Sequence, residues 1–144
     1  MAGKTTDVEI LLVEDDDADL ELTLHALKQH RLANRIHVAR DGEEALRFFE
    51  NGGRVERLVL LDLKLPKVSG LQVLERLRAD ERYRTLPIVV LTSSREEPDI
   101  ERCYALGVNS YIVKPVEFEK FSEAVGKVGL YWLLINEAPH RAQE

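Results

Sequence analysis

The sequence contains a single cysteine, Cys103, among 144 residues. One cysteine cannot form a disulfide within the chain, which agrees with a reducing compartment, and no motif around it suggests redox or nucleophilic chemistry. No apolar stretch approaches the roughly 20 residues of a membrane span, and the first residues lack the apolar core of a signal peptide. We therefore expect a cytoplasmic protein that does not enter a membrane.

Basic residues are outnumbered by acidic ones. Lys and Arg total 20 against 26 Asp and Glu, which gives a formal net charge of −6. This charge repels nucleic acid and attracts cations. The four histidines are scattered without the spacing of a metal site. We therefore expect no nucleic-acid partner, and we expect any bound cation to be held by carboxylates.

The length of the chain has room for one domain with a single core. We expect a disordered lead-in at residues 1–7, a folded domain at residues 8–136 and a flexible tail at residues 137–144.

Short apolar runs alternate with helical patterns throughout this domain. Strands are predicted at residues 10–13, 36–38, 58–61, 86–91 and 110–113, and helices at residues 17–31, 42–50, 71–80, 96–106 and 116–136. This alternation is typical of right-handed βαβ crossovers. The predicted fold is α/β, with one doubly wound, five-stranded parallel sheet and helices on both faces.

Polar residues follow four of the five predicted strands. They are Glu14 and Asp15, Asp62, Thr92 and Lys114. Ligands of open α/β sheets bind outside the carboxyl ends of the strands, so these side chains should meet at one edge. Helix capping is the alternative for Asp62 taken alone and for some acids at residues 14–19, although five acids in six positions exceed what capping needs.

The chemistry of this set points to phosphoryl transfer. Carboxylates held side by side repel one another unless a cation neutralises them, and oxygen ligands suit Mg²⁺. A divalent metal held by Asp15 and Asp62, with the Lys114 ammonium and a hydroxyl nearby, would bind the oxygens of a phosphoryl group. Asp62 is then placed to be the nucleophile, which yields an aspartyl phosphate.

The chain resembles the response-regulator receiver domains of bacterial two-component signalling from residue 8 to about residue 130. The motifs that carry the likeness are the acidic pair after ILLV, the stretch LVLLDLKLPKVSG with Asp62, Pro66 and Gly70, Thr92 in PIVVLTSS, and Lys114-Pro115 in SYIVKP. The resemblance implies a flavodoxin-like fold of the chemotaxis-regulator type, with strand order 2-1-3-4-5 and, in this chain, an extended C-terminal helix.

The resemblance also implies roles for the site residues. Asp62 would accept a phosphoryl group from a histidine kinase, and Thr92 and Lys114 would hold its oxygens. Asp15 and Asp62 would bind Mg²⁺ or Mn²⁺ with the backbone carbonyl of Lys64, while Glu14 would act through a water.

A conformational switch is implied at Thr92 and Tyr111. Phosphorylation would draw the Thr92 hydroxyl inward, and the Tyr111 ring would move with it. The face made by the fourth helix, fifth strand and fifth helix would change as a result. An ordinary buried tyrosine is the alternative for Tyr111, because aromatic residues suit strands regardless of function.

Only 30 residues follow Lys114, which is too few for a helix-turn-helix effector, so we expect a stand-alone receiver. The Glu-Asp pair, ARDGEEAL at residues 39–46, the loop at residues 80–86 and the aromatic tail at residues 131–133 resemble single-domain regulators of bacterial and cyanobacterial phytochromes. This resemblance implies a phytochrome-type histidine kinase as the partner.

The helix predicted at residues 116–136 carries more apolar surface than packing on the sheet requires. We therefore expect a homodimer through this helix. The predicted interface residues are Phe121, Val125, Val128 and Trp132. A helix docked wholly on its own core is the alternative.

Two other functions are alternatives to a phosphoacceptor. A phosphohydrolase with an Asp nucleophile usually needs a second carboxylate two residues later, but that position is Lys64. We therefore expect no enzymatic activity beyond self-catalysed phosphorylation and dephosphorylation of the chain. A pseudo-receiver that only dimerises or acts as a scaffold would not need the acidic pair, Asp62, Thr92 and Lys114, and their presence argues against it.

Overall fold

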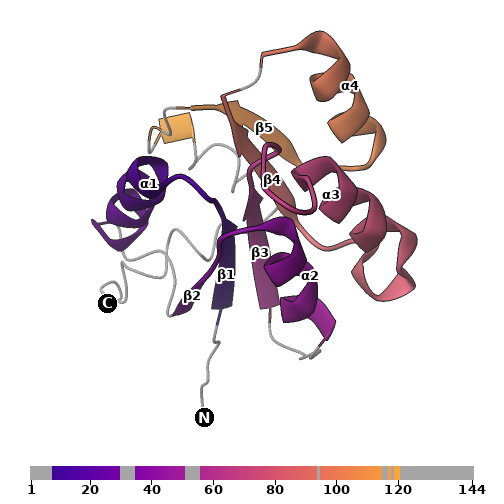
Figure 1. Ribbon diagram of the computed structural model, residues 1–144, viewed down its shortest axis with the longest axis horizontal. Helices are drawn as coiled ribbons and strands as arrows, with labels where there is room; N and C mark the ends of the chain where they lie inside the picture. The colour runs from indigo at the N-terminus through magenta and orange to yellow at the C-terminus, as the bar shows by residue number, and fades with distance from the viewer. Residues whose placement is uncertain are drawn as a thin grey trace, which may run out of the picture.

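The computed structural model describes residues 8–29, 35–50, 56–93, 95–114, 117 and 119–120. Its strands form one parallel sheet in the order β2-β1-β3-β4-β5, which confirms the predicted flavodoxin-like topology (Figure 1). The strands are β1 (Val8–Val13), β2 (Arg35–Ala39), β3 (Glu56–Leu61), β4 (Ile88–Thr92) and β5 (Ser110–Val113). The helices are α1 (Asp17–Gln29), α2 (Gly42–Glu50), α3 (Gly70–Ala79) and α4 (Glu97–Ala105), with a short 3₁₀ helix η2 (Glu81–Tyr83).

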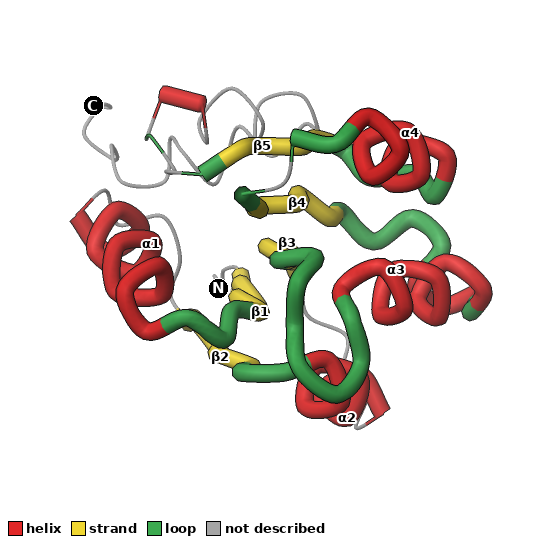
Figure 2. The backbone as a smooth tube through the Cα atoms, turned by 45° about the horizontal axis from the view of Figure 1, so that its top comes forward, coloured by secondary structure: helices red, strands yellow, loops and turns green. Residues whose placement is uncertain are grey.

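The helices cover both faces of the sheet. In Figure 2, α1 lies on one side of the strands, whereas α2 and α3 lie on the other. Strand β1 contributes side chains to the cores on both faces of the sheet, because successive side chains point to opposite faces. Leu11 and Val13 pack in the core beneath α2 and α3, while Ile10 and Leu12 pack in the core that includes α1 residues. Burial on both faces explains why the strands read as continuous apolar runs.

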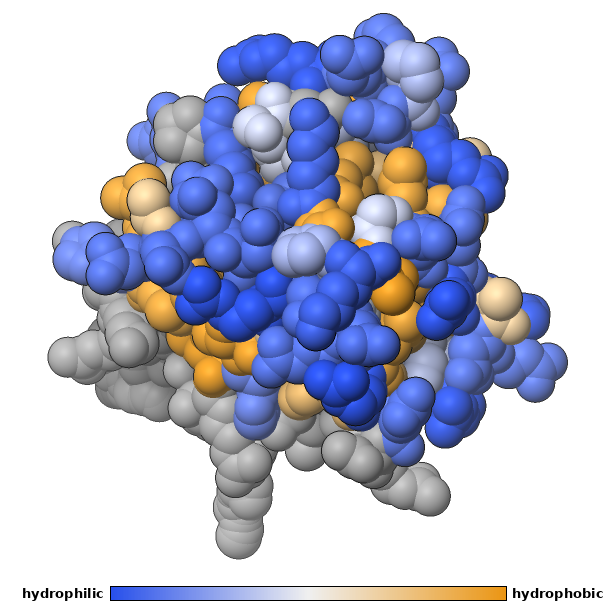
Figure 3. Space-filling view, in the orientation of Figure 1, coloured by the Kyte–Doolittle hydropathy of each residue, from blue (hydrophilic) through white to orange (hydrophobic). Residues whose placement is uncertain are grey.

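The outer surface contrasts with these two cores. On the face seen in Figure 3, hydrophilic side chains dominate, and hydrophobic ones reach the surface in strips between them. Among the described residues, large hydrophobic side chains stand exposed at Leu22 of α1 and Tyr104 of α4. No helix in the described part of the chain has the length and apolar character needed to cross a membrane.

The start of α3 is fixed by a reciprocal cap. The Ser69 side chain accepts a hydrogen bond from the Gln72 N–H at 3.2 Å, and the Gln72 side chain accepts one from the Ser69 N–H at 2.9 Å. This capping box satisfies two backbone donors that a helix start would leave unpaired. The helix therefore begins at Gly70, one residue before the predicted position.

Strand β4 differs from its predicted range at both ends. Leu86 and Pro87 precede it, and Thr92 belongs to the strand instead of following it. The Pro87 carbonyl still accepts a hydrogen bond from the Val59 N–H at 3.1 Å, but proline has no N–H to donate to a ladder. The apolar run LPIVVL therefore begins two residues before the hydrogen-bonded strand.

Arg78, at the end of α3, joins three separate segments. Its guanidinium donates hydrogen bonds to the carbonyls of Tyr83 at 2.8 Å, Leu106 at 2.9 Å and Gly107 at 2.9 Å. One side chain thus links η2 and the turn after α4 to α3. The planar fork of arginine suits such a divergent set of acceptors better than the single ammonium of lysine does.

Replacing Arg78 with Met should lower the free energy of unfolding by about 2–3 kcal/mol, because three carbonyls lose a charged donor while the aliphatic stem is kept. Arg78→Lys should fall between Met and the parent. Urea unfolding followed by circular dichroism measures the difference. A loss in Arg78→Met below about 0.5 kcal/mol, the range of ordinary surface substitutions, would contradict this role.

Cys103 is fully buried on α4, facing the core beneath α2 and α3. Burial raises the pKa of its thiol to about 11, and the charge of Asp99 acts in the same direction. The thiol is therefore protonated at neutral pH, and the thiolate is the reactive form of cysteine.

The predicted dimer interface at Phe121, Val125, Val128 and Trp132 lies outside the described residues, as do the lead-in at residues 1–7 and the tail at residues 137–144. Most of the helix predicted at residues 116–136 also lies outside them.

Candidate functional site

The site forms where the sheet pairing continues past the strand ends. The Asp62 N–H donates to the Val13 carbonyl at 3.1 Å, and the Lys114 N–H donates to the Thr92 carbonyl at 2.9 Å. These backbone hydrogen bonds hold Asp62 beside the end of β1 and Lys114 beside the end of β4. The structure therefore brings Asp62 and Lys114, two of the predicted site residues, to one edge of the sheet.

The alternation of the strands decides which face each side chain joins. Leu12, Leu60 and Ile112 all pack in the core that includes α1 residues. Asp62 and Lys114 come two residues after Leu60 and Ile112, so they continue on the α1 side. Glu14 follows Leu12 by the same interval. The three charged groups are thus directed to one side of the sheet edge by the pattern that builds the core.

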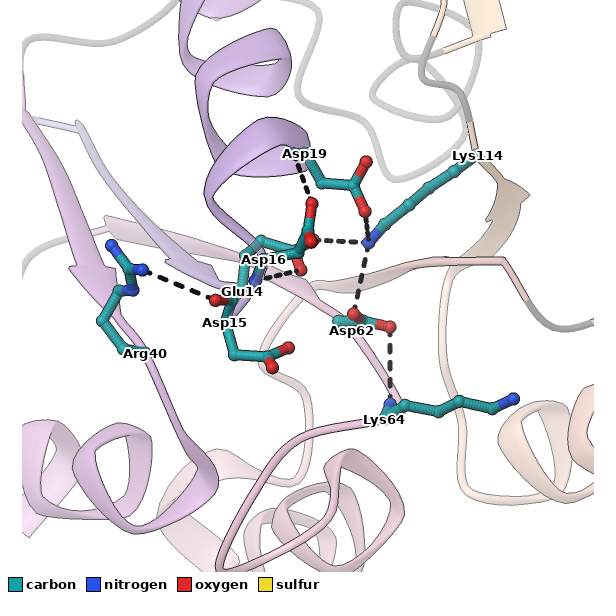
Figure 4. A network of polar contacts seen from close by, with 8 residues as sticks. All are labelled: Glu14, Asp15, Asp16, Asp19, Arg40, Asp62, Lys64 and Lys114. Carbon is teal, nitrogen blue, oxygen red and sulfur yellow. Dashed lines mark hydrogen bonds and ion pairs between the residues drawn. The ribbon is translucent and has the colours of Figure 1, made fainter.

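Lys114 is the centre of the resulting network (Figure 4). Its Nζ donates to Glu14 Oε1 at 2.6 Å, to Asp19 Oδ2 at 2.8 Å and to Asp62 Oδ2 at 3.2 Å. The side chains of Lys114, Glu14 and Asp62 are only 10%, 3% and 9% exposed. Water therefore screens these interactions weakly.

The charges in this network do not balance, since one ammonium faces three carboxylates. Burial alone would lower the pKa of Lys114, but the hydrogen bonds to Asp19 and Glu14 and the charge of Asp62 raise it above its ordinary value. Burial raises the pKa of Glu14, which the hydrogen bond from Lys114 only partly offsets. Further positive charge at this position would stabilise the carboxylates.

Three carboxylates converge in a way that fits a divalent cation. Glu14, Asp15 and Asp62 each offer an oxygen, and these atoms lie within 4.8 Å of one another. Asp15 is exposed while Glu14 and Asp62 are buried, so the cluster opens to solvent on one side. An all-oxygen set that is open to solvent suits Mg²⁺ and Mn²⁺, which keep several bound waters. The predicted metal ligands among the side chains are therefore brought together.

Lys64 contributes to the site through its backbone. Its N–H points to Asp62 Oδ1 at 3.4 Å, a long contact, while its side chain extends away from Asp62 in Figure 4. The role of its carbonyl as a metal ligand stays a prediction.

Thr92 and Tyr111 lie on the opposite side of the sheet edge from Lys114. In the β4–β5 pairing, Val90 is opposite Tyr111 and Thr92 is opposite Val113. Thr92 and Tyr111 therefore share the face of Val90, and Tyr111 packs against that core. Thr92 is fully buried and Tyr111 partly buried, so the structure places the two predicted switch residues on one face.

Sequence reasoning missed Asp19 as a partner of Lys114. Asp19 belonged to the acidic run at residues 14–19, but nothing in the spacing separated it from the capping residues. The structure separates them, because Asp16 Oδ2 accepts the Asp19 N–H at 2.9 Å and caps α1. The ion pair between Arg40 and Asp17 was also missed.

The loop after Asp62 carries a second feature that the sequence does not show. Lys67 adopts a positive φ of 68°, and its Nζ lies 3.6 Å from Asp41 Oδ2. This left-handed conformation is unusual for lysine.

Residues 10–126 match the family model described as the response regulator receiver domain. The probable methanogenesis regulatory protein FilR2 of Methanothrix harundinacea is 45% identical over 90% of this chain and 86% of its own length. Response regulator Rcp1 of Synechocystis is 36% identical over 86% of this chain and 88% of its own length.

Solved structures agree with these sequence relatives. The bacteriophytochrome response regulator AtBRR is 50% identical, covers 90% of this chain and 96% of its own, and superposes with a TM-score of 0.79. The Mn²⁺-bound form of Rcp1 covers 87% of this chain and 94% of its own with a TM-score of 0.71, at 36% identity. The fold, the strand-end carboxylates and these matches agree: the chain belongs to the response regulator receiver domain family.

Proposed function

We propose that this chain accepts a phosphoryl group from a histidine kinase onto Asp62 and signals by changed protein contacts. The observation that carries this proposal is the buried Asp62 carboxylate, bonded to Lys114 and clustered with Glu14 and Asp15 at the sheet edge. A nucleophile, a fixed ammonium and an oxygen-rich cation site are the parts that phosphoryl transfer needs.

Asp62, Lys114, Glu14 and Thr92 have separate roles in the proposed phosphoryl transfer. An Asp62 oxygen attacks phosphorus and forms the new P–O bond, while the bond to the donor breaks and the donor keeps the electron pair. The Lys114 ammonium binds a phosphoryl oxygen, and Glu14 keeps that ammonium in place through its 2.6 Å hydrogen bond. The buried Thr92 hydroxyl binds a second phosphoryl oxygen from the other side of the sheet edge.

A divalent cation completes the site in this proposal. When bound, Mg²⁺ or Mn²⁺ would supply positive charge against the phosphoryl oxygens. Asp15 and Asp62 would hold it with the Lys64 carbonyl, and Glu14 would act through a bound water. The Mn²⁺-bound form of the 36% identical Rcp1 supports this assignment.

The kinase partner is proposed to be of the phytochrome type. Support comes from the 50% identity to a bacteriophytochrome response regulator over 90% of this chain. The output is proposed to run through Thr92 and Tyr111, which share one face of the sheet edge. Withdrawal of the Thr92 hydroxyl toward the phosphoryl group would leave space into which the Tyr111 ring can turn.

Incubation with acetyl phosphate and Mg²⁺ tests this function. We expect the mass of one phosphoryl group to be added to the intact protein, and neutral hydroxylamine to remove it, because acyl phosphates react with that nucleophile. Chelating the metal with EDTA should suppress labelling. An adduct that resists hydroxylamine, or equal labelling with and without EDTA, would contradict the proposal.

A further inference from the structure

Asp19 is the most exposed of the three carboxylates that accept hydrogen bonds from Lys114. It lies in the first turn of α1, and its carboxylate accepts a hydrogen bond from Lys114 Nζ at 2.8 Å. Its side chain is 36% exposed, whereas that of Glu14 is 3% exposed. Asp19 is therefore the partner of Lys114 with ready access to water.

The position of Asp19 is set by neighbouring acids. The Asp19 N–H donates to Asp16 Oδ2 at 2.9 Å, and the Asp16 N–H donates to Glu14 Oε2 at 3.1 Å (Figure 4). The first turn of α1 is thus tied to the same glutamate that binds Lys114. This connection aims the Asp19 carboxylate at the ammonium.

All three protons of the ammonium have acceptors in this state. A lysine ammonium has three N–H donors, and Glu14, Asp19 and Asp62 each accept one. A phosphoryl group on Asp62 competes for the donors of the same ammonium. The 3.2 Å hydrogen bond to Asp62 can pass directly to one phosphoryl oxygen, but a further bond from the ammonium to the phosphoryl group requires Glu14 or Asp19 to release theirs. Releasing Glu14 would leave a buried carboxylate without its cation, which is costly. Releasing Asp19 costs less, because water can solvate it.

We propose that Asp19 is a positioning residue that holds the Lys114 ammonium beside Asp62 and yields it to the phosphoryl group. This inference rests on the proposed function. In the exchange, one Lys114 N–H bond moves from Asp19 to a phosphoryl oxygen, and no proton changes owner. Asp19 therefore favours the unphosphorylated state, and its negative charge opposes the incoming phosphoryl oxygens.

The first arm of the test uses metal-free protein without phosphate. Nitrogen-15 spectra of the lysine ammonium groups measure how fast the Lys114 protons exchange with water. Asp19→Asn should accelerate this exchange several-fold, because a neutral amide oxygen attracts the ammonium less strongly than a carboxylate oxygen does. Asp19→Glu should stay near the parent, and so should Glu21→Gln, which removes the same charge from an exposed position of α1.

This arm decides the positioning role whether or not the protein is phosphorylated. The same exchange rate in Asp19→Asn and the parent would overturn the proposal. The proposal would also be overturned if the Lys114 ammonium of the parent exchanged its protons with water as fast as the ammonium groups of surface lysines do.

The second arm measures the initial rate of labelling by acetyl phosphate at saturating Mg²⁺. Asp19→Asn should be labelled about three- to tenfold faster than the parent, since a competing acceptor and one negative charge are removed. Asp19→Glu should restore the parent rate, and Glu21→Gln should change it less than about twofold.

Labelling of Asp19→Asn at the parent rate or below would overturn the release step. A parent that is not labelled at all would instead refute the proposed function, and the release step with it. The ammonium exchange data would still report on the positioning of Lys114, so the two failures can be told apart.

Discussion

Asp62→Asn is expected to reduce labelling by acetyl phosphate about a hundredfold or more, because the side-chain amide lacks the nucleophilic carboxylate oxygen. The fold should persist, since the amide oxygen can still accept the hydrogen bond from Lys114 that Asp62 accepts at 3.2 Å. We expect the free energy of unfolding to change by about 1 kcal/mol or less.

Intact-protein mass spectrometry after a fixed incubation measures this effect, and circular dichroism checks the fold. Glu101→Gln, which removes an exposed carboxylate from α4, is the matched control and should be labelled like the parent. If Asp62→Asn were labelled as fully as Glu101→Gln, the acceptor would have to be another residue.

Gly70→Ala is expected to destabilise the protein by about 3 kcal/mol or more and to slow labelling. A Cβ at this position would lie 2.1 Å from the Asp62 carbonyl oxygen and 2.6 Å from the Leu63 Cα. Both are backbone atoms, so no side-chain rotation relieves the overlap, and overpacking of this kind is costly. The strand end that carries the Asp62 carboxylate would have to shift away from α3.

The control for this prediction is Gly107→Ala. Gly107 has a φ of 81°, but among the residues that the structure describes its Cβ would meet only the Arg78 side chain, at 3.4 Å. That variant should lose about 1 kcal/mol from left-handed strain alone and should be labelled at the parent rate. Urea unfolding compares the two. Equal stability losses would show that the contact of Gly70 with the Asp62 backbone is unimportant.

The order of elements and the strand-end residues could be predicted from the sequence because they depend on local patterns. Strands buried on both faces require continuous apolar runs, and β3 and β4 show them. In a parallel sheet every strand ends at the same edge, so the residues after the runs had to meet there. Asp62 and Lys114 were found in this way.

The third partner of Lys114 could not be predicted. Whether Asp16, Asp17 or Asp19 reaches the ammonium depends on the rotation of α1 about its axis, which is set by packing of the whole helix. The structure assigns Asp16 to the cap and Asp19 to Lys114. A run of acids in the sequence carries no information on that rotation.

The contacts of Arg78 were beyond sequence reasoning for a similar reason. Its acceptors are backbone carbonyls at Tyr83, Leu106 and Gly107, and every residue has a carbonyl. No residue type marks such an acceptor. Only the tertiary approach of the turn after α4 to the end of α3 brings these carbonyls to the guanidinium.

Locating the phosphoryl group tests the central claim most directly. Borohydride reduces an aspartyl phosphate to homoserine, and peptide mass spectrometry then identifies the modified residue. After incubation of the parent protein with acetyl phosphate and Mg²⁺, we predict homoserine at position 62 and at no other acidic residue. Homoserine at Asp15 or Asp19, or none at all in a protein that carries the label, would contradict the assignment of Asp62 as the phosphoacceptor.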